Sequence, residues 1–158
     1  MNRTDRAAIV LGALFALAFA LSVVMLVTDQ NLRTDFGTIS SGYYAHWYVV
    51  LVTAVADAAG AALLWTVRER RTLVGGTIGA GLLVAVFLGD ILTYSQVGFS
   101  SASQFAQYLF GITYYGGNIR YLYDAVLAVY VVAFAVGLAS VLLSRRSGVS
   151  SEPPPTSP

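Results

Sequence analysis

The chain has 158 residues, of which 57% are hydrophobic and 11% are charged, and its formal net charge is +1. This composition is too apolar and too poor in charge for an ordinary soluble domain, and it indicates a membrane protein. The small net charge and the scattered basic residues argue against a nucleic-acid partner. There is no cysteine and every basic residue is arginine, which excludes thiolate metal sites and a lysine Schiff base, so we expect no cofactor.

Four apolar runs are each long enough to cross a hydrocarbon layer of ~30 Å, which needs about 20 helical residues. They are 7–27, 44–67, 73–94 and 121–143. Because the runs are continuously apolar rather than alternating, they indicate helices and not barrel strands. The sequence therefore predicts an all-α, polytopic membrane protein: a four-transmembrane-helix bundle over residues 1–147 and a disordered cytoplasmic tail at 148–158.

The first run has a rival interpretation as a secretory signal peptide. Arg3 and Arg6 precede it, and the small residues Ala18–Ala20 resemble a cleavage site. The apolar run nevertheless continues to Val27, which is longer than a signal-peptide core of about 7–15 residues. We therefore expect this run to be retained as a membrane span.

Arginine placement predicts the orientation. Seven arginines lie before the first run, between the second and third, or after the fourth: Arg3, Arg6, Arg68, Arg70, Arg71, Arg145 and Arg146. Only Arg33 and Arg120 lie on the other side. The positive-inside rule then places both termini in the cytoplasm of a multi-pass protein of the cell membrane.

Most tyrosines fall at or beyond the outer ends of the runs, and only Tyr130 lies deep within one. We interpret them as an interfacial aromatic belt, with an aromatic binding surface as the alternative. In the second outer loop, 95–120, apolar residues follow a helical period and Gly116-Gly117 ends the pattern. This predicts a short amphipathic helix on the outer surface, or a segment that re-enters the membrane or caps the bundle.

One carboxylate, Asp57, lies in the small-residue run Ala54–Ala62. It follows Tyr44 by thirteen residues, or roughly 20 Å of helix, which places it near the bilayer midplane. An ionised carboxylate there costs at least ~2.5 kcal/mol, so we expect Asp57 to face other helices, to be protonated, or both. No arginine lies within a run, and the expected hydrogen-bond partner of the neutral acid is Thr53 or Tyr130.

Asp90 and Asp124 lie near the outer ends of the third and fourth runs. Thr93 follows Asp90 by three residues and Arg120 precedes Asp124 by four, so each pair shares a helix face. One interpretation is a polar clasp between helix ends. The other makes Asp90, Asp124 and Asp57 successive steps of a proton or cation path from the outside.

Small residues predict where helices approach closely. Gly60 and Ala61 share a helix face with Asp57, and Gly75 and Gly79 form a GxxxG pair in the third run. We expect these four residues to serve helix packing. Because spans two and three are joined by a few residues, they should form an antiparallel pair.

Enzyme chemistry is not expected. The single histidine, His46, lies near the outer surface and has no second histidine for zinc or bis-histidine haem ligation unless a homodimer supplies one. No serine has a histidine partner at a diagnostic spacing, and no metal site is expected.

Two functions remain open. The first is a small, non-catalytic membrane protein, an accessory or structural subunit that packs through its small-residue faces against other membrane subunits or its own copies. The alternative is a proton- or cation-coupled small permease or channel that uses Asp57. A permease needs a hydrated path to Asp57, whereas a structural role predicts a dry, fully hydrogen-bonded acid.

Overall fold

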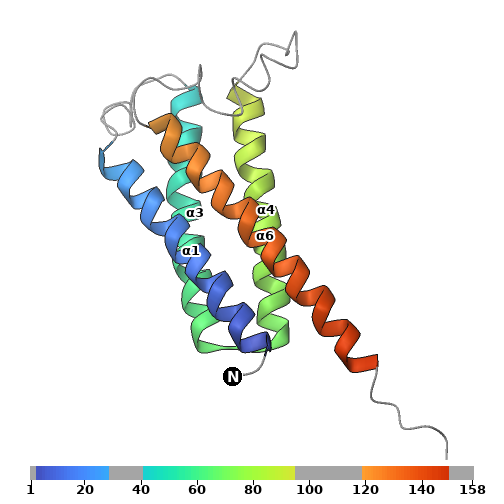
Figure 1. Cartoon of the computed structure of the whole chain (residues 1–158). Helices are drawn as coiled ribbons and strands as arrows, with labels where there is room; N and C mark the ends of the chain where they lie inside the picture. Colours follow the sequence, from blue (N-terminus) through green and yellow to red (C-terminus); the bar gives the residue numbers. More distant parts are fainter. Residues whose placement is uncertain (1–2, 29–40, 95–118, 150–158) are drawn as a thin grey trace, which may run out of the picture.

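The computed structural model describes residues 3–28, 41–94 and 119–149, and the side chains at 41–48, 90–94, 119–121 and 145–149 lie outside that description. The described chain forms four α-helices: α1 (Arg3–Thr28), α3 (Ser41–Thr66), α4 (Arg70–Tyr94) and α6 (Ile119–Val149). Figure 1 shows them packed together, with successive helices running in opposite directions. The predicted loop helix at 95–118 and the tail from 150 onward lie outside the described residues, while 148–149 end α6.

All four helices are long and apolar enough to cross a membrane. The prediction of an all-helical chain with four candidate spans is confirmed at this level, and it suggests a multi-pass membrane protein. Between its first and last turns each helix satisfies its peptide groups through its own backbone, so the apolar middle of a span needs no outside hydrogen-bond partner. This explains why long, continuously apolar sequences adopt this structure.

The arginines whose side chains are described all lie at one end of the helices. A connector at 67–69 joins α3 to α4, and the backbone N–H of Leu73 donates to the carbonyl of Glu69 at 3.0 Å as α4 begins. This connector lies at the same end as the start of α1 (Figure 1). We call this end of the molecule the arginine-rich end. Its exposed arginines are Arg3, Arg6, Arg68, Arg70 and Arg71.

The buried side chains form two clusters that follow one another along the helices. The tyrosine cluster comprises Ala18, Met25, Val50, Phe87, Tyr123, Val126, Leu127 and Tyr130. The leucine cluster lies nearer the arginine-rich end and comprises Ala8, Leu11, Phe15, Ala61, Leu64, Leu73, Ala80, Ala133 and Val141. Leu83, which is half-buried, packs against both clusters.

Close approach of α1 to α3 depends on Gly12. The indole ring of Trp65 covers this glycine, and its Nε1 donates to the carbonyl of Ile9 at 3.3 Å. A Cβ at position 12 would lie 2.5 Å from that nitrogen, so a side chain there would have to displace the indole. Gly137 has the same role between α6 and α4, where it lies directly against Thr77.

Helices α3 and α4 separate beyond their connector. Near it, Leu64 lies against Gly76, where a Cβ would be 3.2 Å from either leucine methyl group. Further along, two grooves of about 320 Å³ each open between the helices, and Ala56 and Leu83 line both. The expected antiparallel pair therefore exists, but grooves take the place of continuous contact along its length.

Candidate functional site

Asp57 lies near mid-length of α3 and faces the interior. Its side chain has 0% exposure, and Thr53 and Ala61, one turn away on either side, are also buried. The three residues recur at a spacing of four, which keeps them on one face of a helix. The face that the small residues predicted for Asp57 is the face that the structure buries.

Tyr130 of α6 is the hydrogen-bond partner of Asp57. Its hydroxyl donates to Asp57 Oδ2 at 2.7 Å, and Tyr130 is itself fully buried. Thr53, the other expected partner, donates its hydroxyl to the carbonyl of Val49 on its own helix at 2.7 Å. The bond therefore joins α3 to α6 through two residues that are 73 positions apart in the chain.

Two aromatic rings hold Tyr130 in position. Phe87 of α4 meets it edge-on, with ring centroids 5.2 Å apart, and Tyr123 packs on Phe87 at 4.4 Å. Edge-to-face pairs of this kind add about 0.5–1.5 kcal/mol to their area burial. The hydroxyl is therefore aimed at Asp57 by packing that does not depend on the hydrogen bond itself.

Two buried polar atoms have no hydrogen-bond partner among the described residues: Asp57 Oδ1 and Ser22 Oγ. Helices α1 and α3 are antiparallel, and Phe15 lies against Gly60. Seven residues further along α1, Ser22 therefore lies at the level of Thr53, one helical turn from Asp57. A buried group without a partner costs about 1–3 kcal/mol, so this level of the interior is polar but incompletely satisfied.

No cation offsets Asp57 within the described part of the chain. The arginines with described side chains, Arg3, Arg6, Arg68, Arg70 and Arg71, lie at the arginine-rich end, where all five are exposed. An ionised Asp57 would have a single neutral donor, the Tyr130 hydroxyl, to stabilise it in an apolar surrounding. The arrangement can accept or release a proton and can fix one helix against another.

The other predicted acids are Asp124 and Asp90, and only Asp124 has a described side chain. Asp124 is half-buried on α6, has a polar or electrostatic contact of its own, and precedes Tyr130 by six residues, or about 9 Å of helix. The side chains of Asp90, Thr93 and Arg120 lie outside the described residues. The proposed clasp and the proposed path between the three acids therefore remain predictions.

The predicted packing glycines fall into two groups. Gly60 faces α1, where a Cβ would meet the ring of Phe15 at 3.6 Å. Gly75 and Gly79 have no atom within 4 Å of an added Cβ, and both line the groove between α3 and α4 together with Gly60. Sequence reasoning placed all of them on packing faces but missed Gly12 and Gly137, which make the closest helix contacts in the described structure.

Ser22 and Phe87 are the site residues that the sequence did not reveal. Ser22 is a single polar residue within the apolar run of α1, a signal that could have marked it as interior. Phe87 has no such signal, because one phenylalanine among aliphatic residues fits either a lipid-facing or a buried position.

No group of three or more histidine, cysteine or acidic side chains that could hold a metal ion occurs among the described residues. Comparison with protein-family models, with curated proteins and with solved structures finds no match. The fold and the buried pair therefore define only a class: an all-helical chain with four candidate membrane spans and one interhelical carboxyl–tyrosine hydrogen bond.

Proposed function

We propose that the protein is a non-catalytic integral membrane subunit whose four helices cross the cell membrane as a bundle with both termini in the cytoplasm. In this proposal a transmembrane helix of a partner subunit lies in the groove between α3 and α4. The arginine distribution supports the orientation, since the exposed arginines of the described residues gather at one end. Four helices of spanning length support the membrane location.

The observation that carries the proposal is the open space at Gly75 and Gly79. In a membrane, helices associate by close packing, and small residues four apart let two backbones approach. Gly76, next to them, is filled by Leu11 and Leu64 of this chain, whereas Gly75 and Gly79 meet nothing within 4 Å. The GxxxG face of α4 is thus turned away from the molecule's own core.

The buried pair fits a structural role beside this groove. Through Asp57 the helix α3 is bonded to α6, and through Gly12 and Gly60 it packs on α1. These contacts fix α3 through α1 and α6, so its position does not depend on filling the groove beside α4. Asp57 lines neither of the two α3–α4 grooves. This agrees with an acid that does not lie on a path through them.

The test is the mass of the complex extracted mildly from its own membranes, with the co-purifying chains identified. We expect a heteromeric complex, and we expect Gly79→Leu to weaken it about tenfold or more, because overpacking a filled interface costs about 1–3 kcal/mol. Gly89→Leu is the matched control, since Gly89 lies on the same helix, also has open space and lines neither groove. A monomeric protein, or equal effects of both variants, would contradict the proposal.

Gly60→Leu is a poorer test of association. A leucine there would reach the ring of Phe15 in the same chain, because even the Cβ would lie 3.6 Å from it. Loss of association in that variant could follow from a disturbed fold. Gly75→Leu repeats the Gly79 test without this difficulty.

One observation favours the alternative, a proton- or cation-coupled permease. Asp57 Oδ1 and Ser22 Oγ are buried without a partner, and a dry structural acid should have been fully hydrogen-bonded. The two functions give opposite results for Asp57→Asn, which keeps an acceptor for Tyr130. In liposomes that contain the purified protein and a pH-sensitive dye, the permease loses proton flux in this variant, while the subunit shows no flux before or after the change.

A further inference from the structure

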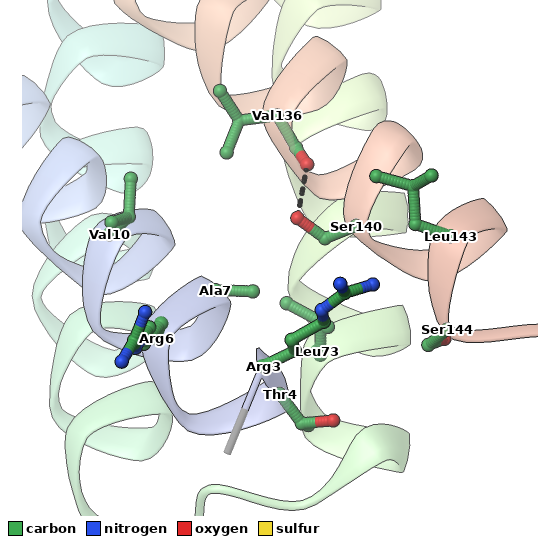
Figure 2. A pocket seen from close by; sticks show the side chains of 10 residues that line it. All are labelled: Arg3, Thr4, Arg6, Ala7, Val10, Leu73, Val136, Ser140, Leu143 and Ser144. Carbon is green, nitrogen blue, oxygen red and sulfur yellow. Dashed lines mark hydrogen bonds between the residues drawn. The ribbon is translucent and has the colours of Figure 1, made fainter. Parts of the chain in front are cut away.

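A third groove lies between α1 and α6 at the arginine-rich end. It has a volume of about 280 Å³ and is shown in Figure 2. Arg3 extends from α1 toward the part of α6 that carries Ser140 and Ser144, and Thr4 lies beside it. Arg6 also lines this groove. The remaining lining residues are apolar: Ala7, Val10, Leu73, Val136 and Leu143.

Polarity changes along the groove in the direction of the membrane. Val10 follows Arg3 by seven residues, or about 10 Å of helix, and Val136 precedes Ser144 by eight, or about 12 Å. Over that length the lining passes from charged and hydroxyl groups to aliphatic side chains only. The same change occurs in a phospholipid between its headgroup and its acyl chains, over a similar distance.

The charged groups of the groove are available to a ligand. Arg3 and Arg6 are exposed, and both side chains line the groove. At this end the exposed arginines outnumber the two described acids, Asp5 and Glu69. The local charge is therefore positive, which favours an anionic headgroup and disfavours one that carries a quaternary ammonium group.

The hydroxyl groups of Ser140 and Ser144 act as donors to their own helix. Ser140 donates to the carbonyl of Val136 at 2.7 Å and Ser144 donates to that of Val141 at 2.8 Å. With their protons engaged in this way, both hydroxyl oxygens keep lone pairs that can accept hydrogen bonds. A headgroup that carries hydroxyl donors next to its phosphate matches a rim with guanidinium donors on one wall and hydroxyl acceptors on the other.

We propose that this groove binds an anionic phospholipid with a hydroxylated headgroup, such as a phosphatidylglycerol. The guanidinium group of Arg3 holds the phosphodiester, Arg6 adds positive charge at the same end of the groove, and one acyl chain lies along Val10, Val136 and Leu143. This site is separate from the groove between α3 and α4 and does not rest on the proposed function. It requires only that the helices stand in a membrane.

The experiment is native mass spectrometry of the purified full-length protein in detergent, titrated with dioleoyl-phosphatidylglycerol or dioleoyl-phosphatidylcholine. We expect preferential retention of phosphatidylglycerol. The double variant Arg3→Gln/Arg6→Gln should lower its apparent affinity roughly thirtyfold, since one arginine near a lipid surface contributes about fivefold. Equal retention of both lipids by the unaltered protein would overturn the proposal.

Arg70→Gln/Arg71→Gln is the matched control. It removes the same charge from the same end of the molecule, but neither residue lines the groove. We expect at most a severalfold loss; a loss equal to that of the Arg3 and Arg6 variant would mean that diffuse surface charge, not this groove, attracts the lipid. Inorganic phosphate in excess should not displace the lipid, and displacement would assign an anion site in place of a lipid site.

A steric variant tests the apolar part with the charge unchanged. Ser140→Phe places a ring into the groove from the exposed side of its own helix turn and leaves both arginines intact. We expect it to reduce phosphatidylglycerol retention as strongly as the arginine variant does. Unchanged retention, with a native circular dichroism spectrum, would show that the lipid is not bound between α1 and α6.

Discussion

The hydrogen bond between Tyr130 and Asp57 should stabilise the fold by a measurable amount. Tyr130→Phe removes the donor and keeps the ring that packs edge-on against Phe87. Asp57 then has both oxygens buried without a partner, since Oδ1 already lacks one. A buried acceptor that loses its donor costs about 1–3 kcal/mol, whereas bonds between membrane helices average ~0.6 and reach ~1.7 kcal/mol. We expect a loss of about 1–2 kcal/mol in the free energy of unfolding.

Single variants do not isolate the energy of this hydrogen bond. Asp57→Ala, for example, removes a costly buried carboxyl as well as the bond. The sign of its effect on stability depends on which of the two is larger. A double-mutant cycle with Tyr130→Phe and Asp57→Ala isolates the interaction, and we expect a coupling of about 0.6–1.7 kcal/mol. Asp57→Asn retains an oxygen acceptor for Tyr130 and should change stability by less than about 1 kcal/mol.

The assay is reversible unfolding in mixed micelles with an increasing fraction of sodium dodecyl sulfate, followed by circular dichroism and tryptophan fluorescence. All four members of the cycle are measured in the same detergent. A coupling below about 0.3 kcal/mol lies within the usual error of additivity and would refute the claim that the bond fixes α3 to α6.

Further predictions concern the two close helix contacts. Gly137→Ala places a Cβ against Thr77 and should destabilise the protein by about 1–3 kcal/mol in the same unfolding assay, and Thr77→Ala in that background should restore part of the loss. Gly12→Ala displaces the Trp65 indole and its bond to the backbone, so it should shift the tryptophan emission as well as lower stability. A Gly12→Ala protein with unchanged emission and stability would mean that α1 does not lie against Trp65.

The helices could be predicted from hydropathy, but their ends could not. The runs at 7–27 and 121–143 correspond to helices that cover Arg3–Thr28 and Ile119–Val149. Hydropathy marks the length that fits into hydrocarbon, whereas backbone hydrogen bonding continues into polar flanks where water is present. The C-terminal end of α6 is the clearest case, because it extends past Arg145 and Arg146 to residues that composition assigned to the tail.

The buried face of Asp57 also followed from the sequence, and Tyr130 was one of the two hydrogen-bond partners that the sequence predicted, the other being Thr53. Asp57 is the one acid deep in a span, and Tyr130 is the one tyrosine at comparable depth, so chemistry left few other pairings. The neighbours of each helix did not follow. Small residues show where a helix can be approached but not by which helix, and Gly60 accordingly packs on α1 while Gly75 and Gly79 face a groove.

This difference has a physical origin. Within hydrocarbon, apolar side chains gain little by leaving lipid for another helix, so helix faces that are apolar all round do not specify a partner or a rotation. A directional hydrogen bond specifies both the partner helix and the rotation. The bond of Asp57 to Tyr130 lies where the tyrosine cluster and the leucine cluster meet, and it fixes the rotation of α3 and of α6 about their axes. Once those rotations are set, the small-residue face of α4 is left without a covering helix from the described chain, and that face is where the proposed partner binds.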